Sequence, residues 1–345
     1  MRDLKDYSLK EHNTFGIEAK CSRFLEYTSI EEAQQVAQIL RESAIPYIII
    51  GGGSNLLLTK DFDGIVVRSG IRTQRDGSFV SRETLTQKNR PSVFVGSGEV
   101  WDEVVAYCVS QGWYGMENLS LIPGDVGASA VQNIGAYGVE AKDLIVSVEA
   151  VEIATGQQVV IPGKDCGYGY RQSKFKHEWK DRYLITHVTY QLSTIFEPRL
   201  DYGNIRAELG RKGIKEPTAQ QLRDTIIEIR NAKLPDPKIE GNAGSFFMNP
   251  VVGREKFESL AAQYEGMPHY DIDAGHVKIP AGWMIDQCGW KGKSLGRAGV
   301  HDKQALVLVN RGGATGAEIV ALSDAIRKDV KAKFDIDIYP EVNII

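Results

Sequence analysis

YGMENLSLIPGDVGASAVQNIGAYGV, residues Tyr114–Val139, is the stretch of this chain that says most about its fold. It combines nine glycine and small residues with almost no charge: Gly115, Gly124, Gly127, Gly135, Gly138, Ala128, Ser129, Ala130 and Ala136. Such a segment builds little core, but its backbone can approach a ligand closely and present N–H groups to it. A solvated linker would not tolerate the apolar residues interleaved with them: Leu119, Leu121, Ile122, Val126, Val131 and Ile134. The segment is therefore predicted to be a buried loop that cradles a ligand.

Composition around this segment is that of a globular protein. The 345 residues favour two or three domains, and the net charge of −4 gives no reason to expect a nucleic-acid or membrane partner. The N-terminal residues lack an apolar signal region, and no apolar run is long enough to span a bilayer. The four scattered cysteines are predicted to be small buried residues in a reducing compartment. We therefore expect a cytoplasmic location.

Periodicity predicts helices and strands in mixed order. Helices are expected at 31–42, 218–232 and 316–333, and strands at 47–50, 64–68, 144–153, 158–161, 183–192 and 336–344. The polar stretch from Arg72 to Ser92 is expected to form a hairpin or an exposed loop. Without strict βαβ alternation, the order indicates an α+β fold rather than a doubly wound sheet.

Glycines also follow the apolar strand at 47–50, in the sequence GGGSN at Gly51–Asn55. The G-x-G-x-x-G pattern of a Rossmann turn is not met, and the following leucines resemble another strand. Two interpretations of GGGSN therefore remain open: a tight turn between strands, or a nest of N–H groups around a pyrophosphate.

Three further places carry chemically capable side chains. Ser245 lies between glycine and two phenylalanines, which fits either a core strand or a serine poised at a partly apolar site. Arg171 follows GYGY and can meet a carboxylate or phosphate, or form an ordinary salt bridge. Glu341, in an apolar terminal strand, is a candidate for catalysis or a paired charge. The histidines show no metal-ligand spacing, so no metal is expected.

Taken together, these segments resemble one family from about Asn13 to the end of the chain. The shared motifs are NTFG at 13–16, GGGSN at 51–55, IPG at 122–124, QNIGAYG at 132–138, YR at 170–171, KLPDPK at 233–238, GNAGSFF at 241–247 and PEV at 340–342. In order and joint presence they resemble the UDP-N-acetylenolpyruvoylglucosamine reductases, flavoenzymes that complete UDP-N-acetylmuramate for bacterial peptidoglycan.

The resemblance implies a fold and a division into domains. It implies a two-subdomain FAD-binding fold of the vanillyl-alcohol-oxidase type, with a C-terminal α+β domain that binds the substrate. The expected boundaries are 1–75 for the first FAD-binding subdomain, 76–217 plus 335–345 for the second, and 218–334 for the substrate domain. The length of Glu265–Gln287, which includes Tyr270, resembles the longer form of the family, with its tyrosine loop.

The implied reaction uses FAD as cofactor and NADPH as co-substrate. NADPH reduces the flavin, whose N5 then passes a hydride to the enolpyruvyl group of UDP-N-acetylglucosamine enolpyruvate. Ser245 matches the proton donor, while Arg171 and Glu341 match residues that face the developing enolate. A monomer is expected.

Further positions match the family's binding residues. The positions implied for FAD are Gly51, Gly52, Gly53, Ser54, Asn55, Asn118, Ile122, Pro123, Gly124, Gly127, Ala128, Gln132, Asn133, Gly135, Ala136, Tyr137 and Gly138. The positions implied for the uridine diphosphate are Tyr202, Arg230, Lys233, Asn249, Tyr270 and Gln304.

Two features depart from the family pattern, and two alternative functions stay open. The polar stretch Asp76–Ser92 is long and is expected to be a surface insertion, and only four residues follow Glu341 to anchor the terminal strand. The alternatives are an FAD-dependent oxidase on the same fold and a flavin-free module that binds sugar nucleotides. Ser245 with Lys233 and Glu341 argues against the oxidase.

Overall fold

The structure is a computed structural model that describes residues 1–75, 78–79 and 90–345. Its contacts form two compact units. The first unit comprises Met1–Tyr7, Cys21–Gly52 and Asp63–Ala232, and the second comprises Ser8–Lys20, Gly53–Phe62 and Lys233–Ile345. This grouping places residues 335–345 with the chain after Lys233, whereas the sequence analysis put them with 76–217; the three domain boundaries stay a prediction.

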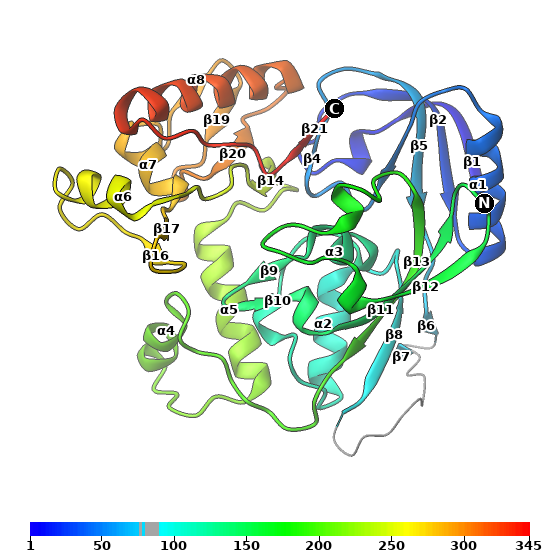
Figure 1. The fold of residues 1–345 in the computed structure, drawn as a ribbon, viewed down its shortest axis with the longest axis horizontal. Coiled ribbons are helices and arrows are strands. Elements are labelled where there is room, and N and C mark those ends of the chain that lie inside the picture. Colours follow the sequence, from blue (N-terminus) through cyan, green and yellow to red (C-terminus); the bar gives the residue numbers. More distant parts are fainter. Residues whose placement is uncertain (76–77, 80–89) are drawn as a thin grey trace. The chain divides into compact units, whose positions relative to one another are not determined.

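Two four-stranded sheets form the first unit (Figure 1). In one sheet the strand order is β1-β2-β5-β3, with β3 and β5 parallel, and in the other it is β12-β11-β13-β8, all antiparallel. The strands run as follows: β1 Arg2–Ser8, β2 Lys20–Tyr27, β3 Tyr47–Ile50, β5 Phe62–Ser69, β8 Ser92–Gly96, β11 Ile145–Glu152, β12 Gln158–Pro162 and β13 Tyr183–Gln191. The ribbons β6 Gln74–Arg75 with β7 Ser78–Phe79, and β9 Gly135–Ala136 with β10 Val139–Glu140, are two-stranded.

Helices of the first unit follow the predicted apolar stripes. Helix α1, Ile30–Glu42, begins after Ser29, whose hydroxyl accepts the Glu32 N–H, and buries Ala33, Val36, Ala37 and Leu40. The other helices are α2 Trp101–Ser110, α3 Val126–Gln132, α4 Ile205–Arg211 and α5 Ala219–Lys233, with 3-10 turns at Glu117–Leu119, Ala141–Asp143, Gly163–Asp165 and Lys174–Lys176. Helices were expected at 31–42 and 218–232, and both are confirmed.

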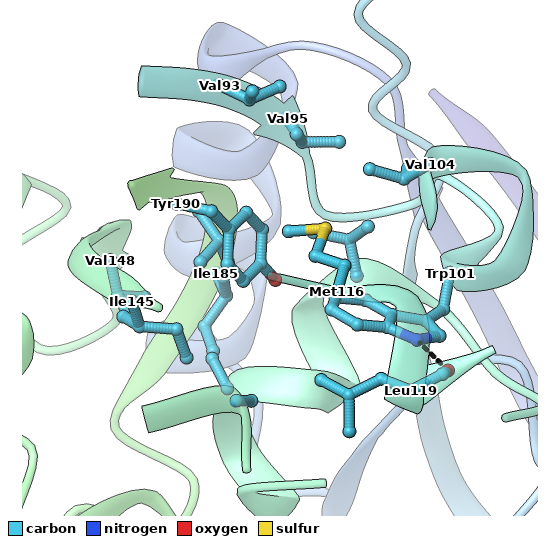
Figure 2. Packing of buried hydrophobic residues seen from close by; sticks show 14 of the residues in the cluster. Val93, Val95, Trp101, Val104, Met116, Leu119, Ile145, Val148, Ile185 and Tyr190 are labelled. Atoms are coloured by element: carbon cyan, nitrogen blue, oxygen red, sulfur yellow. Dashed lines mark hydrogen bonds between the residues drawn. The ribbon is translucent and has the colours of Figure 1, made fainter. Parts of the chain in front are cut away.

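A core cluster of the first unit joins the second sheet to the glycine-rich segment 114–139. Figure 2 shows Trp101 of α2 beside Met116 and Leu119 of the segment, with Tyr190 and Ile185 of β13 close by. All five side chains are buried. The segment is thus built into a core, as predicted, and is not a flexible linker.

In the second unit, helix α8 packs on a four-stranded sheet (Figure 1). The sheet order is β14-β20-β19-β18, and a smaller sheet has the order β15-β17-β16. The strands are β14 Gly241–Ser245, β15 Val251–Gly253, β16 Tyr270–Asp271, β17 His276–Lys278, β18 Ser294–Leu295, β19 Ala298–Val300 and β20 Val307–Asn310. The helices are α6 Arg254–Ala261, α7 Ala281–Gln287 and α8 Gly316–Phe334, with a 3-10 turn at Lys10–His12.

The C-terminal strand is shorter than predicted but better anchored. Within the expected range 336–344, only β21, Asn343–Ile344, pairs in a ladder, parallel to β4, Leu56–Leu57. Pro340 makes an isolated bridge, because its nitrogen cannot donate to a continuing ladder. The Ile345 carbonyl accepts from Thr59 N–H at 2.6 Å, and Ile345 N–H donates to Leu57 O at 2.9 Å. The expectation of weak anchorage is therefore wrong. Most of the predicted insertion Asp76–Ser92 lies outside the described residues.

Candidate functional site

In the first unit, two glycine loops approach each other so closely that a Cβ atom would not fit freely. A Cβ on Gly52 would lie 3.0 Å from Asp125 Oδ1, and one on Gly51 would lie 3.1 Å from the Cβ of Ala128. On the other side of the segment, a Cβ on Gly127 would lie 2.9 Å from that of Ser97. A side chain at Gly127 would require Ser97 to shift, and side chains at Gly51 and Gly52 would require small movements of Ala128 and Asp125, so residues 51–52 and 124–128 pack tightly against one another.

Polar side chains of the glycine-rich segment hold the backbone of the segment itself. The Asn118 amide donates to the carbonyl of Tyr137 at 2.8 Å and to that of Arg199 at 2.9 Å. Asn133, left-handed with φ 46°, ends α3 and donates to Gly169 O at 2.7 Å. Both asparagines were predicted to contact a cofactor. That contact stays a prediction, and in the structure their side-chain amides hold the backbone of the segment in shape.

A buried acid that the sequence analysis did not select lies between the glycine loops. Asp125 is 6 % exposed and pairs with Arg68 at 3.3 Å. Burial raises its pKa, and the Arg68 charge opposes that rise only in part. The Nε of Arg68 is enclosed and has no hydrogen-bond partner among the described residues. An aspartate just before a short helix looks in sequence like an ordinary helix start, so no signal distinguished it.

Arg171 lies against the end of the glycine-rich segment. Its guanidinium donates to Gly135 O at 2.6 Å and to Asn133 O at 3.4 Å. The Tyr170 ring lies 5.4 Å from its Cζ, and Lys176 Nζ donates to its carbonyl at 3.0 Å. The first unit therefore brings the candidate catalytic arginine and the candidate cofactor loop together.

Two predicted substrate residues gather at the same end of the segment. The Tyr202 ring lies edge-on to that of Tyr137 at 6.4 Å, and Tyr202 is 43 % exposed. The Nε of Arg230 is enclosed without a hydrogen-bond partner among the described residues. Burial lowers the pKa of Arg230 and the Arg171 charge adds to this, against the opposing influence of Tyr137 and Asp102. Two arginines close to one another, with an unsatisfied enclosed donor, fit an anionic group.

In the second unit, the backbone brings Ser245 and Glu341 to one corner. Glu341 N–H donates to the carbonyl of Phe246, the residue after Ser245, at 2.8 Å. The Asn55 amide donates to Glu341 O at 3.2 Å, so the end of the GGGSN loop adjoins the same corner. Ser245 is exposed, while Phe246 and the next residue are buried. Ser245 is thus the last residue of strand β14, and it is exposed there and not part of the core.

The other predicted substrate residues of the second unit lie on different elements. Asn249 Oδ1 accepts the N–H of Ala281, the first residue of α7, at 2.9 Å. Gln304 Oε1 would lie 3.0 Å from a Cβ on Gly282, so both amides meet the first turn of α7. Tyr270, on β16, is 46 % exposed and Lys278 Nζ lies 5.6 Å from its ring. Lys233, at the end of α5, is also exposed.

The remaining predicted cofactor positions belong to the same two stretches of sequence, 51–55 and 118–138. They are Gly53 and Ser54 in the second unit, and Ile122, Pro123, Gly124, Ala128, Gln132, Ala136 and Gly138 in the first. Over the described ranges, no helix is both long and apolar enough to cross a bilayer.

Comparison with known proteins gives matches over nearly the whole chain. A model of the FAD-binding domain matches residues 22–161, and a model of the C-terminal domain of UDP-N-acetylenolpyruvoylglucosamine reductase matches residues 236–345. A UDP-N-acetylenolpyruvoylglucosamine reductase from Bacteroides fragilis is 57 % identical, and the match covers 98 % of this chain and 99 % of that protein. One from Paraburkholderia xenovorans is 45 % identical over 98 % of this chain and 96 % of its own length.

A solved structure agrees at the level of the fold. The UDP-N-acetylenolpyruvylglucosamine reductase of Thermus caldophilus has a TM-score of 0.67 at 20 % identity, with 99 % of this chain and 98 % of that one covered. The α+β fold, with an FAD-binding domain followed by a C-terminal domain, is therefore confirmed, as is FAD as the cofactor. The chain belongs to the UDP-N-acetylenolpyruvoylglucosamine reductase family.

Proposed function

We propose that this protein reduces the enolpyruvyl group of UDP-N-acetylglucosamine enolpyruvate to the lactyl ether, giving UDP-N-acetylmuramate, with NADPH as the reductant. The observation that supports this most is the joint presence of a glycine cradle in the first unit and the Ser245–Glu341 corner in the second, in a chain of this family. A cradle alone would suit many flavoproteins. The corner supplies an acid chemistry that an oxidase does not require.

The residues present fit FAD on structural grounds. The glycines at 51, 52, 124 and 127 carry no side chain that would screen their main-chain N–H groups from a ligand, and the enclosed nitrogens of Arg68 and Arg230 fit a ligand with negative charge. We assign the cofactor to Gly51–Asn55 and to positions 118, 122–124, 127–128, 132–133 and 135–138. FAD held there would supply the hydride transfer from NADPH to the terminal vinyl carbon of the substrate.

The chain's own residues handle the proton and the charge. Reduction of a carbon–carbon double bond adds one hydride and one proton, so after hydride addition the carbon next to the carboxylate needs a proton donor. We assign that proton to the Ser245 hydroxyl, since the intermediate carbanion is basic enough to take it. Arg171 stabilises the negative charge of the enolate that forms next to the substrate carboxylate, and Glu341, in its protonated form, donates a hydrogen bond to that enolate.

Uridine diphosphate recognition is assigned to Tyr202, Arg230, Lys233, Asn249, Tyr270 and Gln304. Arginine and lysine match phosphate oxygens in charge, and tyrosine and amide side chains can donate to them. Finer features of the proposal are a cytoplasmic location, a monomeric enzyme, and no nucleic-acid or membrane partner.

Anaerobic half-reactions test the proposal. The purified protein should carry FAD, and NADPH should bleach its visible absorption. Addition of UDP-N-acetylglucosamine enolpyruvate without oxygen should then restore that absorption. A flavin that is reoxidised only by oxygen would indicate the oxidase instead, and a protein that does not take up FAD would indicate a flavin-free module.

A further inference from the structure

The first turn of α2 holds the residues just before and within Ile122-Pro123-Gly124 at three points. Trp101 Nε1–H donates to Leu119 O at 2.9 Å, which Figure 2 shows as a dashed line. The Asp102 carboxylate accepts Leu121 N–H at 2.6 Å, and Trp101 N–H donates to Gly124 O at 3.0 Å. The turn thus fixes both ends and the middle of a six-residue stretch.

Leu121 needs such a hold because of its backbone conformation. Its φ is 58°, in the left-handed region that side chains other than glycine and asparagine rarely adopt. The direction in which the chain leaves Leu121 decides where the next three residues go. The hydrogen bond to Asp102 stabilises this conformation directly, since it engages the N–H of the same residue.

Arg223, on α5, completes the arrangement. Its Nη1 and Nη2 donate to the two oxygens of Asp102 at 2.6 and 2.9 Å, and its side chain is 9 % exposed. Burial pushes the pKa of Asp102 upward, but the hydrogen bonds from Arg223 and Leu121 outweigh it and leave the pKa lowered. Asp102 therefore remains a charged acceptor at neutral pH.

An acid in the first turn of a helix is common because of the helix dipole. That explanation requires neither a bidentate arginine from another helix nor a hydrogen bond to a left-handed leucine. The Asp102–Arg223 ion pair joins α2 to α5 (Figure 1).

We infer that Asp102 and Arg223 are a positioning pair for the FAD site, which hold Leu121 in its left-handed conformation and thereby place the backbone of Ile122-Pro123-Gly124 against the cofactor. Neither residue touches FAD in this inference. It rests on the proposed function, in which residues 122–124 bind FAD, and it adds two residues that no sequence motif had marked as functional.

The decisive experiment is a rescue. Asp102→Ala should weaken FAD binding to the apoprotein by about ten- to a hundredfold, measured as quenching of flavin fluorescence, because a charge-assisted hydrogen bond is lost. Leu121→Gly in that background should recover most of the loss, because glycine adopts φ > 0 without help. If the role of Asp102 were merely structural, the double variant would bind FAD no better than Asp102→Ala, and the inference would be overturned.

A second comparison covers the case in which Asp102→Ala does not fold. D102N/R223Q keeps neutral hydrogen-bonding partners, and D102L/R223M replaces them by apolar side chains of similar size, which buried pairs often tolerate. The first should bind FAD within about threefold of wild type and the second about tenfold more weakly or worse. Equal affinities would overturn the inference.

Two controls separate the inference from the proposed function. D3L/R23M removes another bidentate pair of the first unit, in which the Arg23 Nε and Nη2 donate to Asp3 at 2.8 and 2.7 Å, and should leave FAD affinity unchanged. A wild-type apoprotein that does not bind FAD would refute the proposed function. A wild type that binds FAD, with variants that bind equally well, would refute only the positioning pair.

Discussion

The glycine-rich segment of the first unit and the Ser245–Glu341 corner of the second are held in opposite ways. In the segment, side chains hold backbone, since Asn118, Asn133 and Asp102 all bond to main-chain groups. At the corner, backbone mainly holds backbone, through the Phe246–Glu341 hydrogen bond and the pairing of Ser245 with Val307 in β14 and β20, and the Asn55 amide adds one side-chain hydrogen bond to Glu341 O. In the glycine-rich segment, side chains thus fix the conformation of the main chain. At the Ser245–Glu341 corner, the main chain fixes the positions of side chains that can react.

This difference predicts which property each region controls. Substitutions in the segment should change stability and cofactor affinity, because they alter the shape of a backbone. Substitutions at the corner should change one chemical step and leave the fold almost intact.

The largest effect is expected at the corner. Ser245→Ala should slow reoxidation of the reduced enzyme by the enolpyruvyl substrate about a hundred- to ten-thousandfold, the usual contribution of a general acid. Reduction of the flavin by NADPH should stay close to normal, because no substrate proton is transferred in that step. Stopped-flow absorbance of the two anaerobic half-reactions measures both rates.

Ser259→Ala, an exposed serine on α6 in the same unit, is the matched control and should change neither half-reaction. If both half-reactions fell together in Ser245→Ala, the serine would be structural and the contrast between the two regions would fail.

Where α2 contacts the segment, Trp101→Phe should lower the free energy of unfolding by about 2–3 kcal/mol, because ring volume is lost and the Leu119 carbonyl is left unsatisfied. Denaturant unfolding with and without FAD measures it. The same substitution at Trp179, a half-buried residue of the first unit outside the segment, should have a smaller effect and leave FAD affinity unchanged. Equal effects at both positions would show that the segment has no special dependence on α2.

Sequence predicted the elements well where periodicity is local. The stripe of α1 and the strands of the second sheet follow from spacing within one window, and the glycine content of 114–139 indicated close approach. The bond between Asp102 and Arg223 joins residues on two helices far apart in the chain, and each residue alone looks like an ordinary helix charge. Such pairs depend on tertiary packing, which no local pattern encodes.

The prediction of a terminal strand at 336–344 failed for a related reason. Alternating Ile336 and Ile338 are buried, as a strand predicts, but Pro340 interrupts the donor pattern and the ladder begins only at Asn343. Its anchorage comes from Leu57 and Thr59, which adjoin the GGGSN loop in sequence. The sequence analysis considered the GGGSN region only as a ligand site. The residues that follow it also pair with the C-terminal strand, which an interpretation based on ligand binding could not reveal.

Two helical glycines test whether close approach explains the composition of the segment. Gly127→Ala should destabilise the protein by about 1–2 kcal/mol, because the new Cβ meets Ser97 at 2.9 Å. Gly210→Ala, in α4 with nothing within 4 Å of its Cβ, should stabilise it by about 0.5–1 kcal/mol through reduced chain entropy. Thermal and denaturant unfolding would give the two signs, and a shared sign would refute the spatial argument.

The smallest effect concerns a buried acid of the segment, Glu117, which is 4 % exposed and accepts Gly115 N–H at 2.9 Å. Burial raises the pKa of Glu117 in the fold. The folded state therefore binds more protons than the unfolded chain between the ordinary glutamate pKa and the raised one, and stability decreases as pH rises through that window. Glu117→Gln retains an acceptor for Gly115 without the charge, so it should exceed wild type in stability at pH 7 by no more than about 1 kcal/mol, and by less at pH 5.

Urea unfolding at both pH values measures the gap in stability between Glu117→Gln and wild type. Glu197→Gln, which changes an exposed acid of the same unit, is the control and should show little change at either pH. A gap that widens toward pH 5 would mean that the charged form of Glu117 is favoured by the fold, and that this acid, unlike the asparagines beside it, does more than shape the backbone.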